Sequence, residues 1–450
     1  MFILGFRLFI PAENQAFLRY AQAEKRPPHI SLELIQKYIK VKKKDKKNMR
    51  KFNRLLVVIE KVRKAKILFS FSILLNIIFI FGSFYLVSKI GLTSISNRIF
   101  GPVGPTGTIV STVYNTTNKD TISASIRGIA IDMQGESLLL ASTRPGKLCF
   151  DSIVKRSVIV RSTYQRYNSK CKVYLEGIDY TVDYNKGEIT RTINSSIPDY
   201  SKNILYGQKD FDHTKFSDFS NHPYFIWVDY VTKNGALLAL PNDQSKYLVN
   251  FRKKLETGMP VTIVSYGNSI TAGGEASSTE LRFQSIYGNY LKSIFPKANF
   301  KIEDVSIPGY SSTQGIDWWD SYIGKTSPDL VLVGWGMNDH NIGNNTPEQF
   351  RQNLVKLVGM IKERKKAEVI LYSSFPPNND WHFGSHSMEL YAEATKLAAL
   401  DANCAYVDVY NTWVKVLQRK DQSSLLGNNI NHPNDFGHWL YAQAFEAMSF

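Results

Sequence analysis

The chain has 450 residues, enough for two or three domains that each bury a core. With 43% apolar and 21% charged residues, its composition excludes disorder over the whole chain. The net charge of +16 is concentrated near one end: residues 1–66 hold 18 Lys and Arg against 5 Asp and Glu, whereas the rest holds 37 against 34. This distribution argues against nucleic-acid binding by the folded part.

An uncharged stretch of 22 residues, ILFSFSILLNIIFIFGSFYLVS, lies between Lys66 and Lys89. As a helix it is about 33 Å long, enough to cross a hydrocarbon core of about 30 Å. It is longer than the apolar part of a usual signal peptide, and no small-x-small cleavage site follows it closely. A run this apolar is also rare in buried helices of soluble domains. We therefore predict a transmembrane signal anchor at residues 67–88, with the lipid bilayer as its partner.

The charges on either side of this stretch predict its orientation. Residues 42–66 are dense in Lys and Arg, whereas residues 90–101 carry a single Arg. The positive-inside rule then places residues 1–66 in the cytoplasm as a basic segment, and the chain after the anchor outside. Met49 begins a compact module of a basic stretch and an apolar helix, so Met1 and Met49 are both possible starts of translation.

The exported part begins with a Pro- and Gly-rich linker at residues 101–107. Residues 108–255 then show short alternating strands and turns without helical periodicity, which predicts a β-sandwich accessory domain. Aromatic residues are frequent in it, at Tyr200, Tyr206, Phe211, Phe216, Phe219, Tyr224 and Trp227. These side chains form either a glycan-binding face or part of the core, and core packing is the favoured interpretation.

Two turns in this region predict hairpins. Asn185-Lys-Gly is followed by an alternating strand, and Lys233-Asn-Gly separates expected strands at residues 224–231 and 236–240. Of the three cysteines, Cys149 and Cys171 are free to pair outside the cytoplasm, and two unpaired thiols fit their spacing equally well.

From about residue 258 the pattern changes to strands that alternate with helices. Five apolar runs predict strands at residues 261–266, 300–307, 329–335, 368–373 and 404–410. Helices are predicted at residues 281–294, 346–364 and 387–400. This alternation predicts a parallel sheet covered on both faces, an α/β/α sandwich over residues 258–450. Ligands of such sheets bind at the carboxyl ends of the strands.

Four motifs fall at those strand ends or before the last helix. Ser269 follows the first strand in SYGNSITAGG, and Gly309 follows the second in VSIPGYSS. Asn338 follows the third strand in GWGMNDH, and His432 lies in NHPNDFGHWLYA before the last helix. A serine beside a histidine suits nucleophilic catalysis, in which the histidine acts as the base.

The four motifs together resemble the SGNH (GDSL-like) hydrolase family, whose blocks supply Ser, Gly, Asn and His in this order. The resemblance covers residues 258–450 and implies a flavodoxin-like fold that needs no cofactor. It implies that Ser269 attacks the acyl carbon and that His432 is the general base. It also implies an oxyanion hole made by the N–H groups of Ser269 and Gly309 and the side-chain amide of Asn338.

One position departs from the family pattern. The family places Asp three residues before the catalytic histidine, and here that position is Asn429. An asparagine can accept a hydrogen bond from the imidazole but cannot stabilise the imidazolium as a carboxylate does. The alternatives are a dyad in which Asn429 orients His432, a backbone carbonyl as the partner, or a carboxylate from elsewhere, namely Asp435, Asp339 or Asp421.

The expected activity is hydrolysis of an acetyl or short acyl ester on an extracytoplasmic carbohydrate. A carbohydrate O-acetyltransferase would use the same residues, and a non-catalytic glycan-binding protein is the third alternative. His382 and His386 have a spacing that suits a metal on a helix, but Phe383-Gly384 interrupts the segment and no third ligand is evident, so no metal is expected.

Overall fold

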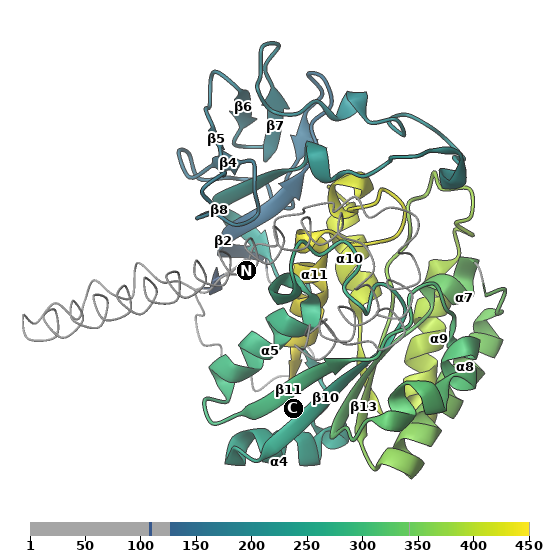
Figure 1. Ribbon diagram of the computed structural model, residues 1–450. Helices are drawn as coiled ribbons and strands as arrows, with labels where there is room; N and C mark the ends of the chain where they lie inside the picture. The colour runs from purple at the N-terminus through teal and green to yellow at the C-terminus, as the bar shows by residue number, and fades with distance from the viewer. Residues whose placement is uncertain (1–107, 110–126, 342, 450) are drawn as a thin grey trace, which may run out of the picture. The chain divides into compact units, whose positions relative to one another are not determined.

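The computed structural model describes residues 108–109, 127–341 and 343–449 (Figure 1). The predicted cytoplasmic segment at 1–66, the membrane anchor at 67–88 and the linker at 101–107 lie outside these residues. Among the residues described, no helix combines the length and the apolar character that crossing a bilayer requires.

The C-terminal part is built on a parallel sheet of five strands. They are β10 (Pro260–Gly267), β11 (Asn299–Asp304), β12 (Leu330–Gly334), β13 (Glu368–Tyr372) and β14 (Ala405–Val407). The spatial order is β11-β10-β12-β13-β14, and every neighbouring pair is parallel. The predicted parallel α/β sheet is confirmed, and its order is the flavodoxin-like one, in which the chain reverses direction across the sheet between β10 and β12.

Helices cover both faces of this sheet. α5 (Phe283–Ile294) packs against α11 (Asp435–Glu446), and α8 (Pro347–Met360) packs against α9 (Met388–Asp401). Figure 1 shows these two pairs on opposite sides of the sheet. All five residues of β12 are buried, as expected for a strand covered on both faces. Shorter helices complete the fold: α4 (Val249–Thr257), α6 (Ser312–Asp317), α7 (Met337–Asn341) and α10 (Val409–Leu417).

The capping box predicted at the start of α8 is present. Thr346 accepts a hydrogen bond at Oγ1 from the N–H of Gln349 at 3.2 Å, and Gln349 accepts one in return at 2.9 Å. The helix continues as a π-helical turn, Ile361–Lys365, and ends at Lys366, whose φ is +56°. The predicted helix at 346–364 is therefore confirmed with nearly the same ends.

The β-rich part contains two antiparallel sheets. One has the order β1 (Thr108–Ile109), β2 (Arg127–Leu138), β8 (Ile226–Ala236), β4 (Ile159–Arg161) and β5 (Val173–Tyr174). The other has the order β3 (Gly146–Lys147), β7 (Glu188–Arg191) and β6 (Tyr180–Asp183). Strands β9 (Asn242–Asp243) and β15 (Met448–Ser449) form a separate parallel pair. Buried side chains of both parts form one continuous hydrophobic core, and the division of the chain between residues 255 and 258 stays a prediction.

One hairpin predicted in this part is confirmed and the other is wrong. β6 and β7 pair across the turn at Gly187, whose φ is +63°. At Lys233-Asn-Gly the chain does not turn: β8 runs through to Ala236 and pairs with β2 on both sides of an irregularity at Lys233 and Asn234. Gly235 serves close packing instead: a Cβ atom there would come within 2.3 Å of the side chain of Ile131.

A buried ion pair joins the β-rich part to the end of the α/β part. Nζ of Lys420 is 2.7 Å from Oε1 of Glu136 on β2, and both side chains have no exposed surface. Tyr230 donates its hydroxyl to Oε2 of the same carboxylate at 2.6 Å, and the N–H of Cys149 donates to Oε1 at 2.9 Å. Cys149 is a free thiol, as are Cys171 and Cys404, so no disulfide joins the first two.

Candidate active site

Ser269 and His432 meet at the carboxyl edge of the parallel sheet. Ser269 lies just after β10, and His432 lies in the loop before α11. Oγ of Ser269 is 2.7 Å from Nε2 of His432, which is a hydrogen-bond distance. A serine nucleophile needs such a contact, because the base takes the hydroxyl proton as the oxygen attacks.

Gly267 lets the nucleophile loop lie close to the neighbouring strand. A Cβ atom at Gly267 would lie only 2.1 Å from the carbonyl oxygen of Gly334, at the end of β12. Thr271 donates from Oγ1 to this same carbonyl at 3.0 Å, and its hydroxyl lies 2.7 Å from that of Tyr372. The loop that carries Ser269 is therefore held between β10 and β12, the point of an open parallel sheet where ligands bind.

Gly274 and His438 support the imidazole of His432. A Cβ atom at Gly274 would lie 3.4 Å from Cγ and Nδ1 of His432, so this glycine backbone lies against the ring. Nε2 of His438 is 3.1 Å from the carbonyl oxygen of Gly274. Burial lowers the pKa of His438 to about 4, so this ring is neutral near pH 7 and donates its Nε2 proton to that carbonyl.

Asn428 faces the second ring nitrogen of His432. Nδ2 of Asn428 is 3.0 Å from Nδ1 of His432. Oδ1 of Asn428 accepts hydrogen bonds from three successive backbone N–H groups, those of residues 430–432, each at 3.0 Å. These three bonds fix the orientation of the amide, so its NH₂ group is the one that meets the imidazole. The neutral ring then accepts at Nδ1 and carries its own proton on Nε2, toward Ser269.

The prediction that Asn429 orients His432 is wrong. Asn429 has a φ of +57°, in the left-handed region, and its side chain contacts a different set of residues. Its Oδ1 accepts hydrogen bonds from Tyr200 at 3.2 Å, Asn221 at 3.2 Å and Asn378 at 3.4 Å. Because all three donors are remote in sequence, tertiary packing decides where this side chain lies.

The other partners considered for His432 also lie elsewhere. Asp435 accepts from Ser277 at 2.7 and 2.8 Å, Asp421 pairs with Arg144 at 3.5 Å, and Asp339 binds Ser312. Over the described part of the chain, no backbone carbonyl accepts from Nδ1 of His432. The amide of Asn428 is therefore the group that orients the ring.

Glu275, which was not identified from the sequence, carries a carboxylate that acts on the pKa of His432. Burial lowers the pKa of His432, and the negative charge of Glu275 acts in the opposite direction. Oε2 of Glu275 is 2.7 Å from Nε2 of His222 in the β-rich part, and this contact raises the pKa of His222 and lowers that of Glu275. No motif marks Glu275; its φ of +65°, directly after Gly274, shows only in the structure.

Gly309 and Asn338 belong to two segments that the structure brings together. Gly309 follows β11 with a φ of +80° and is exposed, and its N–H donates to no other described residue. Nδ2 of the buried Asn338 donates to the carbonyl of Tyr310 at 2.9 Å. Asp339, whose pKa is raised by burial, accepts from the N–H of Ser312 at 3.0 Å and cross-links the same segments. Gly309 and Asn338 thus lie on neighbouring segments after β11 and β12, and their role as oxyanion donors stays a prediction.

His382, one of the two histidines considered as metal ligands, contacts an aspartate. Nδ1 of His382 is 2.8 Å from Oδ1 of Asp210, in an exposed pair. Over residues 127–341 and 343–449, no three His, Cys, Asp or Glu side chains are grouped so that they could hold a metal ion.

A parallel α/β sheet with a serine–histidine pair at its carboxyl edge is typical of a serine hydrolase. Residues 265–440 match the GDSL-like Lipase/Acylhydrolase family, so the chain contains a domain of this family. The match confirms the predicted class of enzyme, an SGNH-type serine esterase. None of the curated proteins compared with the chain matches it.

Solved structures to which this chain is similar include several esterases. A two-domain esterase active on acetylated mannans is 22% identical, with a TM-score of 0.39 over 46% of this chain and 53% of the esterase. This chain thus matches about half the length of that protein. An acetylxylan esterase from Geobacillus stearothermophilus is 20% identical, with a TM-score of 0.35 over 42% of this chain and 94% of its own. An α/β hydrolase from the metagenome of Lake Arreo, Spain, is 22% identical, with the same TM-score and the same coverage of both chains.

Proposed function

We propose that this protein hydrolyses acetyl or other short acyl esters on a carbohydrate through an acyl-enzyme on Ser269. The observation that carries the proposal is the 2.7 Å contact between Oγ of Ser269 and Nε2 of His432 at the carboxyl edge of the sheet. A nucleophile and base in this position within a GDSL-like domain support ester hydrolysis.

In the proposed mechanism, Ser269 attacks the acyl carbon while Nε2 of His432 takes its proton. The N–H groups of Ser269 and Gly309 and the amide of Asn338 stabilise the oxyanion. His432 then gives its proton to the leaving sugar alkoxide, and a water molecule repeats both steps to release the acid. Since the imidazole rests with its proton on Nε2, it must first exchange to the tautomer that carries the proton on Nδ1.

Two features of this chain support a carbohydrate substrate: the predicted membrane anchor and an exposed aromatic side chain beside a cavity. The predicted anchor at 67–88 would place the hydrolase domain outside the cytoplasm, where acylated polysaccharides are exposed, and we propose a single-pass protein with a cytoplasmic N-terminus. Trp381 is 4% exposed and Phe211 is 5% exposed, so these aromatic side chains pack in a small core and bind no glycan directly. Tyr206, by contrast, remains 37% exposed beside a cavity.

The experiment that tests the function uses the full-length chain with p-nitrophenyl acetate, butyrate and octanoate, and with acetylated xylan and mannan. We expect turnover to fall with acyl length and acetate to be released from at least one polysaccharide. Ser269→Ala and His432→Ala should both lose this activity. The matched controls, Ser385→Ala and His382→Ala, change exposed residues of the same types and should keep it. Wild-type turnover no higher than that of Ser269→Ala would reject the proposal.

A further inference from the structure

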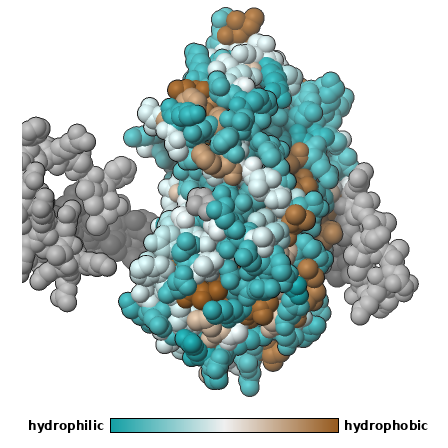
Figure 2. Space-filling view, turned by 90° about the vertical axis from the view of Figure 1, so that its right-hand side faces the viewer, coloured by the Kyte–Doolittle hydropathy of each residue, from teal (hydrophilic) through white to brown (hydrophobic). Residues whose placement is uncertain are grey.

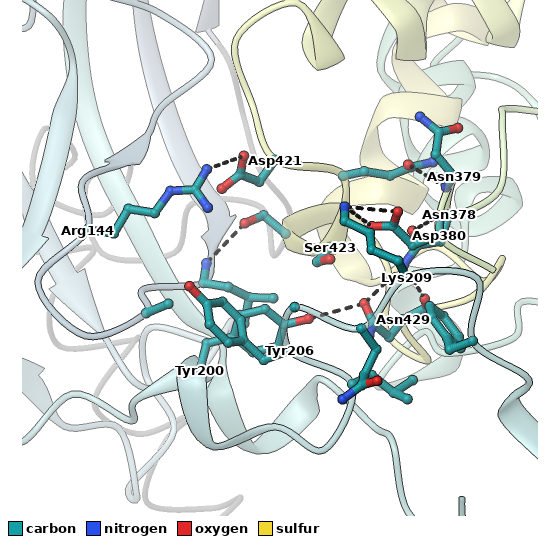
Figure 3. Close-up of a pocket in the computed structure, with 18 of the residues that line it drawn as sticks. Arg144, Tyr200, Tyr206, Lys209, Asn378, Asn379, Asp380, Asp421, Ser423 and Asn429 are labelled. Atoms are coloured by element: carbon teal, nitrogen blue, oxygen red, sulfur yellow. Dashed lines mark hydrogen bonds and ion pairs between the residues drawn. The ribbon is translucent and has the colours of Figure 1, made fainter. Parts of the chain in front are cut away.

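A cavity lies apart from the serine–histidine pair. Its volume is about 470 Å³, within the range of small-molecule sites. Its walls come from four segments remote in sequence: residues 139–145, 200–211, 378–380 and 421–429 (Figure 3). Ser269, Gly309, Asn338 and His432 do not line it. The cavity therefore lies between the β-rich part and the hydrolase part, outside the proposed catalytic centre.

Asn429 presents a hydrogen-bond donor to this cavity. The side chain is 2% exposed, and its Oδ1 is held by the three donors from Tyr200, Asn221 and Asn378. These bonds fix which end of the amide is oxygen, so Nδ2 is the free end. Among the residues described, Nδ2 donates to no protein atom, and it is not sealed from solvent. An oriented donor with no protein acceptor is suited to a ligand oxygen.

Two tyrosines form the aromatic side of the cavity. The ring of Tyr200 is buried and packs edge-on against that of Tyr206, with centroids 5.6 Å apart. Tyr206 is 37% exposed, so one part of its ring is open to a ligand. Figure 3 shows both rings beside Asn429 at the same side of the cavity. A rigid aromatic surface next to an oriented amide matches a ligand with an apolar C–H face and hydroxyl groups.

The charges around the cavity are paired. Arg144 lies 3.5 Å from Asp421, and Lys209 lies 2.9 Å from Asp380. Two cations and two carboxylates therefore leave no net charge among the charged side chains that line the cavity. Such a lining gives little attraction to an anion and favours an uncharged ligand.

We propose that this cavity binds an uncharged pyranose unit of the glycan substrate, with Tyr206 against its C–H face and Nδ2 of Asn429 donating to a hydroxyl. The inference deepens the proposed function, on which it rests for the class of substrate, by adding a second binding site that anchors the chain. Asn429 is next to Asn428, which orients His432, so the proposed binding site borders the loop that carries the catalytic base.

The test measures binding by calorimetry to the full-length Ser269→Ala protein, so turnover cannot interfere. The neutral probes are mannopentaose, xylopentaose and cellopentaose, none of which carries an acetyl ester, and penta-N-acetylchitopentaose. Pentagalacturonic acid is the charged comparison. We expect at least one neutral oligosaccharide to bind, and to bind more tightly than pentagalacturonic acid. Tyr206→Ala and Asn429→Asp should each weaken that binding by about tenfold or more, since Asp keeps the acceptor oxygen and loses the donor. Tyr167→Ala, at a tyrosine that is 84% exposed elsewhere, is the matched control and should bind like the parent.

Three outcomes would overturn the inference: no neutral oligosaccharide binds at millimolar concentration, the acidic one binds best, or binding is unchanged in both cavity variants. Failure of the esterase activity is a separate result, because p-nitrophenyl acetate does not need the cavity. With Ser269 intact, Tyr206→Ala should therefore keep wild-type turnover of p-nitrophenyl acetate while it releases acetate from polysaccharide more slowly.

Discussion

The amide nitrogen of Asn428 lies 3.0 Å from Nδ1 of His432, at the position where serine hydrolases commonly place a carboxylate. The amide oxygen is committed to the backbone N–H groups of residues 430–432, so a simple flip of the side chain would lose three hydrogen bonds. This arrangement holds the imidazole in place but favours the tautomer that donates to Ser269. It therefore orients the base without activating it.

Asn428→Asp should raise activity. One carboxylate oxygen can keep the three backbone hydrogen bonds, while the other accepts from Nδ1–H and stabilises the imidazolium. We expect kcat for p-nitrophenyl acetate near pH 8 to rise about tenfold or more, because the reverse change in a serine protease costs about 10⁴. Asn428→Ala is the comparison and should lower both kcat and Tm, since three N–H groups lose their acceptor. An unchanged kcat in Asn428→Asp would show that this residue does not set the state of His432.

Asn338→Ala should lower kcat by about 10²–10³ with little change in KM, because an oxyanion donor acts mainly in the transition state. The buried side chain also donates to the carbonyl of Tyr310, so Tm is measured beside the kinetics. Thr313→Ala, on the neighbouring exposed surface, is a control that should keep kcat. A rise in KM at constant kcat would assign Asn338 to ground-state binding instead.

The pH profile of kcat/KM should report the state of His432. Burial lowers the pKa of this base, so the acid limb should have its midpoint below about 6.5, the ordinary histidine value. Glu275 opposes this effect, since its charge favours the imidazolium. Glu275→Gln should therefore move the acid limb to still lower pH. His222→Ala leaves the Glu275 charge unpaired and should move the acid limb to higher pH. A shift of the acid limb in the same direction in both variants would contradict the effect assigned to the Glu275 charge.

Lys420→Met should destabilise the fold strongly. It leaves the fully buried carboxylate of Glu136 without its cation, which costs about 3–5 kcal/mol. The free energy of unfolding in urea checks this value. Lys301→Met removes one partner of an exposed pair with Glu303 and should cost no more than about 1 kcal/mol. Adding Glu136→Gln to Lys420→Met should recover part of the loss; no recovery would show that packing, not charge, is responsible.

The fold of the hydrolase part could be read from the sequence because its central strands β10, β12 and β13 are largely buried on both faces. Each of the five predicted strands is present, with ends shifted by a few residues. Continuous apolar runs are a direct consequence of burial in the central strands, whereas the edge strand β11 has only exposed and half-buried residues. The β-rich part was less predictable. A turn-like Asn-Gly became part of a register irregularity near the end of β8, because pairing with β2 on both sides outweighed the local preference.

The sequence by itself determined the order of Ser269, Gly309, Asn338 and His432 along the chain. It placed the first three at strand ends and His432 before the last helix. It also indicated the GDSL-like class through these motifs. Only the tertiary structure decided which asparagine meets the imidazole. Asn429 occupies the expected position in the motif, but its side chain binds Tyr200, Asn221 and Asn378, which are up to 229 residues away. Spacing along the chain carries no information about such contacts, because they depend on how remote segments pack.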